Sequence, residues 1–344
     1  MCYNYLTVNN TVIQNFLRKY KMAHQIDFSN NRANVAWTGD RKEVWHGLGS
    51  SMEEGQSLDA WKETAGLGWE IFESKVMYQS GMETKTMDDK KVLFRSDTQE
   101  ALAVVGADYK IVQPAQVVDF FQDLTSIHGM KMSTMGSLFG GRRFWALAEI
   151  GESFETVKGD KIDGYMLLCT SADGTLSTIA KVTSQRVVCN NLLTAAIGEN
   201  SKNLIKVSHR STWDATQVKM DMGLISEGWG KFSDDMKKLA NVEITDMQAN
   251  AYFVNKLYDK NKSAEDQTWG TVKTVANLMS LFKGGMGAEF APNSAYNILQ
   301  AVTENADHFG VRKVDAGRKF MDNAFGKGDD FKTEVYADMM ALAA

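Results

Sequence analysis

The chain has few prolines and cysteines and no long apolar segment. Two prolines in 344 residues leave no proline-rich linker to divide it. The three cysteines are an odd number without metal-type spacing, and the apolar surroundings of Cys169 and Cys189 predict small core side chains. No apolar run reaches the roughly 20 residues that a membrane helix requires. We therefore expect a cytoplasmic protein without disulfides or a membrane span.

Sequence signatures of catalysis are also missing. The chain contains no Gly-x-Ser-x-Gly, Walker, His-Glu-x-x-His or dinucleotide-binding motif. Five histidines are scattered without a partner at metal-binding spacing. Asn297, Glu304 and His308 share one stripe of a predicted helix, which fits half a metal site, an acid–base pair or a polar contact between helices. We predict no enzymatic activity, no metal and no cofactor.

The residues that are present describe a globular protein with an ordinary core. Hydrophobic residues make up 44% of the chain and charged residues 24%. The net charge of −5 excludes a protein that is basic throughout. A local basic surface is still compatible with this total, because nucleic-acid binding depends on where the charge lies.

The first two thirds of the chain are predicted to be rich in strands. Residues 69–78 and 91–96 are expected to be strands joined by a polar turn over residues 82–90. Ser57 is expected to cap a short helix over residues 58–65. Pro114 is expected to lie in the first turn of another helix, and residues 143–150 are expected to form a strand.

The best-patterned segment is residues 164–210. Its alternation predicts two strands joined by an Asp173-Gly174 turn, and a third strand around Ile205. Between them, apolar residues at helical spacing predict a helix from Ser184 to Gly198. This β-β-α-β order indicates an antiparallel sheet core packed with helices.

The last third of the chain is predicted to be helical. Amphipathic patterns cover residues 215–239, 245–258, 266–282, 294–309 and 330–342. Strands followed by helices indicate an α+β fold, with a sheet core over residues 22–212 and a helical region over 213–344 packed on it. Residues 1–21 differ in composition and are expected to be an upstream-start extension, a disordered tail or a short docked helix.

Positive charge is concentrated in the segment from Thr175 to Arg210, where five cations accompany one acid, Glu199. Cations on a sheet face with nearby aromatic rings fit single-stranded nucleic acid, because phosphates meet the cations and bases stack on the rings. The alternative is a solvated sheet edge protected by charge. The predicted phosphate contacts are Arg186, Lys206, Arg210, Lys181, Arg142 and Arg143, and the predicted stacking residue is Trp145.

Several motifs resemble one known family. They include Trp45-His-Gly-Leu-Gly, Tyr109-Lys-Ile-Val-Gln, Leu167-Leu-Cys-Thr-Ser-Ala-Asp-Gly-Thr and Arg186-Val-Val-Cys-Asn-Asn. Together they are similar to a family of phage and plasmid proteins of unknown function, from about Met22 to the end of the chain. The resemblance implies a phage or plasmid origin and the cytoplasm of a host cell, and it implies no particular activity.

The predicted β-β-α-β core is similar to that of phage single-strand annealing proteins. That similarity implies a homo-oligomer that holds single-stranded DNA in a basic groove without a cofactor. We therefore expect a single-stranded-DNA-binding protein of recombination or replication. The alternative is a non-enzymatic structural or host-interaction protein of a phage or plasmid.

Overall fold

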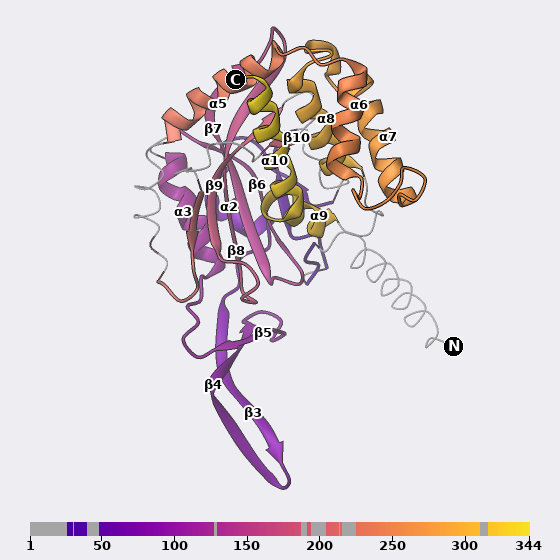
Figure 1. Cartoon of the computed structure of the whole chain (residues 1–344). Coiled ribbons are helices and arrows are strands. Elements are labelled where there is room, and N and C mark those ends of the chain that lie inside the picture. The colour runs from indigo at the N-terminus through magenta and orange to yellow at the C-terminus, as the bar shows by residue number, and fades with distance from the viewer. Residues whose placement is uncertain are drawn as a thin grey trace, which may run out of the picture.

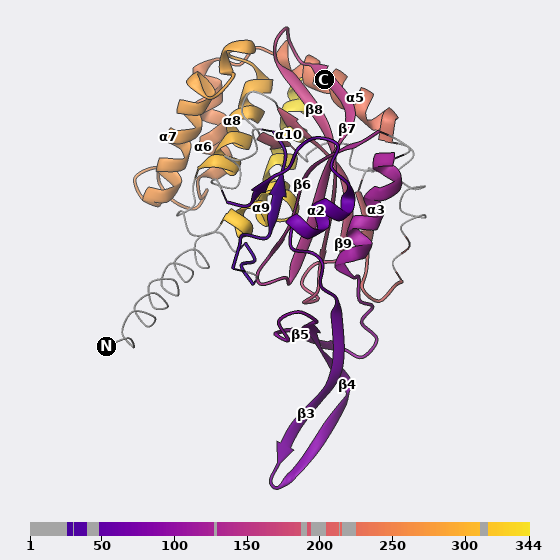
Figure 2. The ribbon, with the colours of Figure 1, turned by 180° about the vertical axis from the view of Figure 1, so that it is seen from behind.

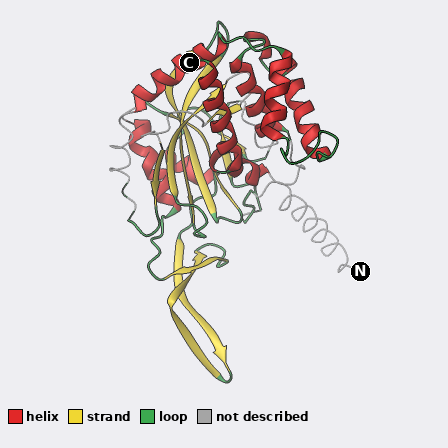
Figure 3. Ribbon diagram, in the orientation of Figure 1, coloured by secondary structure: helices red, strands yellow, loops and turns green. Residues whose placement is uncertain are grey.

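The computed structural model describes residues 26–29, 31–39, 48–126, 129–186, 191–193, 204–212, 214, 225–309 and 316–344 (Figure 1). Residues 1–21, the expected extension, lie outside this described part, as does most of the Trp45-His-Gly-Leu-Gly motif. The described chain is a mixed α+β structure, so the predicted fold class is confirmed (Figure 3).

An eight-stranded sheet forms the centre of the molecule. Its order is β10-β9-β8-β7-β6-β1-β2, with β11 also paired to β9. All pairs are antiparallel except β1 with β2. The strands are β1 (Val35–Trp37), β2 (Ser50–Ser51), β6 (Lys131–Leu138), β7 (Arg143–Glu155), β8 (Lys161–Ser171), β9 (Thr178–Arg186), β10 (Asn191–Leu193) and β11 (Leu204–Val207).

Both faces of the central strands are covered, so these strands are apolar on both sides. Phe144, Ala146 and Leu168 face the core that includes helices α2 (Leu58–Thr64) and α3 (Pro114–Ser126). Trp145 and Leu167 face the opposite core, which includes helix α9 (Ala316–Phe325). Figure 1 shows α9 and α10 (Lys327–Leu342) in front of the sheet, and Figure 2 shows α2 and α3 on the reverse side.

The C-terminal third is helical, as predicted, and packs beside the sheet (Figure 1). Its other helices are α5 (Ile225–Ala240), α6 (Asp246–Leu257), α7 (Trp269–Gly284) and α8 (Ala295–His308), with a short 3-10 helix at Ala288–Phe290. Thr245 and Gln248 form a capping box at the start of α6. On α5, Trp229 and Phe232 pack against Phe154 of β7, which joins the helices to the sheet.

A long hairpin arm projects from the body (Figure 1). It consists of β3 (Ile71–Ser80) and β4 (Glu83–Arg95), with β5 (Ala101–Gly106) paired to the base of β4. The predicted polar turn over residues 82–90 is wrong, because residues 83–90 are part of β4 and the turn lies at Gly81 and Met82. Residues 83–90 are exposed, so a mainly polar sequence is compatible with a strand there.

The predicted helix from Ser184 to Gly198 is also wrong wherever the structure describes it. Ser184 to Arg186 belong to β9, and Asn191 to Leu193 form β10 paired back onto them. The other residues of that range lie outside the described part. The β-hairpin before it and the strand after it are confirmed, since β11 pairs with residues 178–181 of β9.

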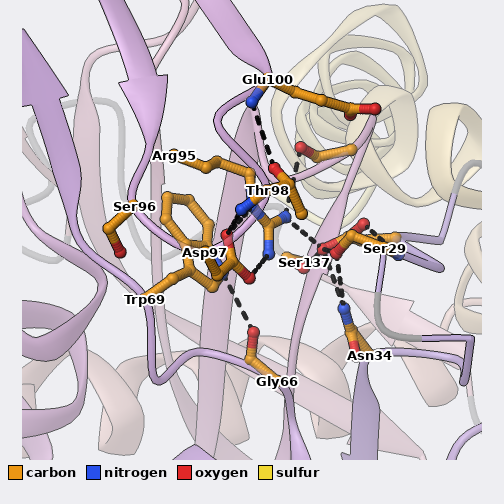
Figure 4. A network of polar contacts seen from close by, with 12 residues as sticks. Ser29, Asn34, Gly66, Trp69, Arg95, Ser96, Asp97, Thr98, Glu100 and Ser137 are labelled. Atoms are coloured by element: carbon orange, nitrogen blue, oxygen red, sulfur yellow. Dashed lines mark hydrogen bonds and ion pairs between the residues drawn. The ribbon is translucent and has the colours of Figure 1, made fainter.

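A buried charge cluster fixes the arm to the body (Figure 4). The Arg95 guanidinium, at the end of β4, donates to Asp27 Oδ2 at 2.6 Å and to both carboxylate oxygens of Asp97 at 2.7 and 2.9 Å. It also lies 4.1 Å from the ring centroid of Trp69. The Arg95 and Asp27 side chains are 0% and 1% exposed. We name Asp27, Arg95 and Asp97 the clamp, because they join the arm to the segment before β1.

Asp27 is ionised in the clamp because its negative charge is well compensated. Burial raises the pKa of Asp27, but the positive charge of Arg95 and several hydrogen bonds outweigh it, and the pKa lies below its usual value. Asn34 Nδ2 and the Ser29 N–H donate two of those hydrogen bonds, and Ser137 Oγ also donates to Asp27 Oδ2. Within the clamp, Arg95 and Asp27 are therefore a fully buried ion pair that neighbouring polar groups support, and Asp97 is its partly exposed third member.

Candidate nucleic-acid interface

The register of β9 separates the predicted cations. Thr178, at one end of β9, lies opposite Val207, three residues before Arg210. Arg186, at the other end, lies opposite Ile162 of β8. Eight residues of strand span about 26 Å, so the backbone of Arg186 is far from that of Arg210. The side chain of Arg186 lies outside the described part of the structure.

Two other predicted contacts lie in the core. Lys181 is 5% exposed; its ammonium donates to Asp329 at 3.0 Å and to the Ala324 carbonyl. Burial lowers the pKa of Lys181, and Asp329 opposes that shift. Trp145 is 0% exposed and packs over Gly136. In this structure a ligand at the surface reaches neither side chain.

Lys206 is exposed, but it belongs to a different surface. It lies opposite Ile179, which in turn lies opposite Cys169. Directly opposite residues point to the same side of a sheet, so Lys206 is on the side covered farther along by α9. The structure thus separates Lys206 from Arg210, although the sequence places both on one strand face.

Arg142, Arg143 and Arg210 are brought to the same end of the sheet, where the arm leaves it. Arg143 donates to Thr175 Oγ1 in the turn between β8 and β9 at 2.9 Å. The Arg142 carbonyl accepts from the Ala172 N–H at 2.7 Å, and the Arg142 side chain is exposed. Arg210 lines one hollow together with Asp173 and Gly174 of the same turn.

A groove of about 1050 Å³ lies between this end of the sheet and the base of the arm. We name it the arm-base groove. Its wall from the arm includes Lys90 and Val104, and its wall from the sheet includes Gly174 and Arg210. Lys90, Lys110 and Arg210 are exposed cations along it. Of these three cations only Arg210 was predicted as a phosphate contact, because Lys90 and Lys110 are distant from it in the chain.

A stacked pair of rings forms part of the groove. Tyr109 and His209 lie with their centroids 4.5 Å apart and their planes at 17°. Tyr109 Oη donates to the Ser171 carbonyl at 2.8 Å, and burial raises the pKa of Tyr109 to about 12. Both ring nitrogens of His209 lie 3.0 Å from a carbonyl oxygen, one of Lys110 and one of Leu176. These contacts hold both rings in place, and Tyr109 is the more exposed of the two.

Charge is balanced inside the groove and positive beside it. The three cations of the groove are accompanied by Asp89, Asp108 and Asp173. Asp173 is already engaged, because it accepts from the N–H and the hydroxyl of Thr175. Arg142 and Arg143 add two positive charges on the adjoining turn. This arrangement can bind phosphate groups along an aromatic surface. The sequence analysis used Tyr109-Lys-Ile-Val-Gln only as a family motif and did not predict its place in this groove.

A second hollow of about 950 Å³ lies elsewhere, between α2, α3 and the sheet. Among the described residues that line it, the acids are Glu53, Glu54, Asp59, Glu149 and Asp163, and the one cation is Lys131. Such a lining disfavours phosphate. In the part of the chain that the structure describes, no cluster of His, Cys, Asp or Glu side chains has the geometry of a metal site.

The polar stripe on α8, formed by Asn297, Glu304 and His308, hydrogen-bonds to the backbone at the end of α7 and just after it. Asn297 is buried, and its amide donates to the Phe282 carbonyl at the end of α7. Glu304 is buried and accepts from the backbone N–H of Met286 at 3.1 Å. His308 is exposed at the end of the helix. Of the three interpretations of this stripe, these contacts fit the polar connection between helices.

Comparison with known proteins assigns this chain to one family. No described helix is both long enough and apolar enough to cross a bilayer. No curated protein and no solved structure matches the chain significantly. The model of one family, described as a domain of unknown function (DUF932), matches residues 101–324, which is more than half of the chain and covers most of the sheet and helices α3 to α9. The chain therefore belongs to the DUF932 family.

Proposed function

We propose that this chain binds single-stranded nucleic acid at the arm-base groove and the adjoining turn, without catalysis and without a cofactor. The observation that supports it best is the convergence of Lys90, Lys110 and Arg210 around Tyr109, from three separate segments of the chain. Phosphates would contact the cations, and a base would stack on the exposed side of Tyr109. Arg142 and Arg143 would extend the phosphate path across the turn.

The biological setting rests on the motif resemblance. The similarity to phage and plasmid proteins supports the cytoplasm of a host cell as the location and implies no activity. A homo-oligomer of recombination or replication is proposed from the likeness to phage annealing proteins, and the helix which that likeness expects over residues 184–198 is replaced by strands where the structure describes this range. The groove is open to the solvent at the base of the arm, and a flexible single strand can follow such a path more easily than a rigid duplex.

Binding of a labelled oligothymidine, measured by fluorescence anisotropy over a series of salt concentrations, tests this proposal. The logarithm of the affinity should fall linearly with the logarithm of salt, with a slope of about −0.7 per neutralised phosphate. Replacing Lys110 and Arg210 together by Ala should make the slope shallower by about 1.4. Absence of binding at low salt would contradict the proposal.

A matched control removes two positive charges at a surface outside the groove. Lys260 and Lys262 are exposed beyond α6, and their double replacement by Ala should leave the slope unchanged. Lys206→Ala distinguishes the groove from the surface of β11, because the groove proposal expects no change in slope. A shallower slope in Lys206→Ala alone would move the site to β11.

The alternative function, an interaction protein, is favoured by the hairpin arm. Large apolar side chains are exposed along it, including Met77 at 64% and Met82 at 105%. Soluble proteins seldom expose such side chains in a contiguous group unless another surface covers them. This observation and nucleic-acid binding are compatible, because the arm extends well beyond the groove (Figure 1).

A further inference from the structure

The outer edge of β3 is a strand edge without a neighbour in the described sheet. The three-stranded sheet of the arm has the order β3-β4-β5, so β3 pairs with β4 on one side only. Strand β5 pairs with β4 only from Lys90 to Phe94, which leaves the outer arm as a two-stranded ribbon. A two-stranded ribbon is marginally stable in water, and an open edge favours pairing with another strand.

The base of the arm shows which backbone groups face outward. The amide of Gln113 accepts from the Ile71 N–H at 2.8 Å and donates to the Ile71 carbonyl at 3.0 Å. Both backbone groups of Ile71 therefore point away from β4. Backbone groups alternate along a strand, so those of Glu73 and Lys75 also point outward, and both residues are exposed.

The charges of Glu73 and Lys75 favour one symmetric pairing of this edge with a second copy. In an antiparallel pair of two β3 edges, a residue whose backbone N–H and C=O point away from β4 must lie opposite another such residue. A two-fold axis must therefore pass between the two copies of one and the same residue of β3. An axis at Glu73 would oppose two carboxylates, and an axis at Lys75 would oppose two ammonium groups. Glu73 already accepts from Lys91 of its own copy at 2.7 Å. An axis at Ser74 also places each Glu73 opposite the second copy's Lys75, so that each carboxylate lies between two ammonium groups.

An axis at Ser74 also brings compatible side chains together on the other face of the strand. It places Phe72 opposite the second copy's Val76, and the Ser74 residues of the two copies opposite each other. Phe72 is 44% exposed and already contacts Phe94 edge-to-face, with centroids 5.9 Å apart. Pairing would therefore cover an apolar pair on one face while it joins opposite charges on the other. An axis at Val76 would instead oppose both charges to uncharged side chains, Met77 and Gln79.

We infer that two copies of this chain pair through the outer edges of β3, antiparallel over residues 72–76, with the two-fold axis at Ser74. The pairing joins two arms into one continuous sheet. It uses the clamp only as the support that holds each arm in position. The inference specifies an interface for the homo-oligomer proposed above, but it does not depend on nucleic-acid binding, since neither Glu73 nor Lys75 lines the arm-base groove.

A cysteine at the axis tests the register directly in the full-length chain. At the non-hydrogen-bonded pair on the axis, the two Cα atoms would lie about 4.5 Å apart, within the range for a disulfide. Ser74→Cys should therefore form a covalent dimer under mild oxidation. In Val76→Cys the two cysteines would lie about 13 Å apart, and no covalent dimer should form. The parent chain controls for its native cysteines.

Charge exchange provides the second measurement, by sedimentation over a concentration series. Glu73→Lys alone and Lys75→Glu alone should each weaken dimerisation on the order of tenfold. The two together should restore most of it, since only the contact of residue 73 with Lys91 in its own copy stays unfavourable. Lys85→Glu, on the exposed part of β4, is the matched control and should have no effect. The inference is overturned if folded Ser74→Cys cross-links no more than the parent chain, if Val76→Cys cross-links instead, or if the double exchange fails to restore the dimer.

Discussion

Removing the arginine of the clamp should destabilise the protein by several kcal/mol. In Arg95→Met the side chain keeps much of its volume but loses its charge and its donors. Asp27 then loses its nearest positive charge while it is still 1% exposed, and Asp97 loses two hydrogen bonds. Breaking a buried pair by removing one partner costs about 3–5 kcal/mol, because an uncompensated charge is left behind.

This free energy converts into a measurable shift of the melting temperature. For 344 residues the entropy of unfolding is about 0.7 kcal/mol/K, if the chain unfolds as one unit. The expected decrease in Tm is therefore about 4–7 °C, followed by circular dichroism. Arg95→Lys should be intermediate, since an ammonium keeps the charge but cannot donate to both oxygens of Asp97 in the guanidinium geometry.

The loss of stability in Arg95→Met should also depend on pH, and it should be smaller in acid than at neutral pH. In the wild-type chain the pKa of Asp27 is lowered, so its stabilising contribution is complete above the unfolded pKa of about 3.9. That contribution is lost as the pH falls through the lower folded pKa. Without Arg95 the pKa of Asp27 rises, so the difference between variant and wild type should be largest near neutral pH and should shrink in acid.

Lys85→Met is the control for loss of a positive charge on the arm. Its side chain is 48% exposed, so its Tm should change by less than about 1 °C. Hydrogen exchange at the base of the arm would show whether Arg95→Met opens this region first; the amide of Ser96, bonded to the Glu70 carbonyl, is a suitable reporter. If Arg95→Met melted within about 1 °C of the wild type, the clamp would not be an important source of stability.

Two further changes test the packing of the sheet, each by thermal or urea unfolding. Lys181→Met should destabilise by about 3 kcal/mol because Asp329 loses its ion pair with Lys181 and keeps only the weaker influence of Lys332. Adding Asp329→Leu should recover most of the loss. Neither variant should change oligonucleotide binding, since Lys181 is buried. Gly136→Ala should cost about 1–3 kcal/mol, because its Cβ would lie 2.8 Å from both the Asn34 carbonyl oxygen and the Trp145 ring. Wild-type stability of Lys181→Met or of Gly136→Ala would show that the site adapts without strain.

The helices could be predicted where one side of a segment is buried and its start is marked by a cap. Ser57 caps α2 as expected, with its hydroxyl accepting from the Ala60 N–H, and Thr245 caps α6. The same logic failed for residues 184–198, since Leu192 and Leu193 fit a helical stripe as well as a short strand. The segment is extended because Leu192 pairs with Gln185 of β9, a contact that the spacing of apolar residues in the sequence does not reveal.

The candidate site was less predictable than the fold, because charge in a sequence does not reveal which face of a sheet is covered. Lys181 and Lys206 are both cations in strands, yet α9 and α10 cover Lys181 and leave Lys206 exposed. Trp145 lies under the same layer. Lys90 and Lys110 join Arg210 only through the fold of the arm, which local patterning in the sequence does not encode.

The proposed nucleic-acid binding and the inferred pairing of two copies use opposite edges of the arm, so either one can be wrong while the other holds. The inferred pairing uses the outer edge of β3, whereas the arm-base groove is lined by Lys90 of β4 and by residues of β5. Both depend on the clamp, because Arg95 ends β4 and joins the arm to Asp27, in the segment before β1. A loss of dimerisation with unchanged oligonucleotide binding in Glu73→Lys would therefore separate the edge from the groove. A dimer would then place two grooves at fixed positions on one continuous sheet, which would allow a single strand to contact both copies.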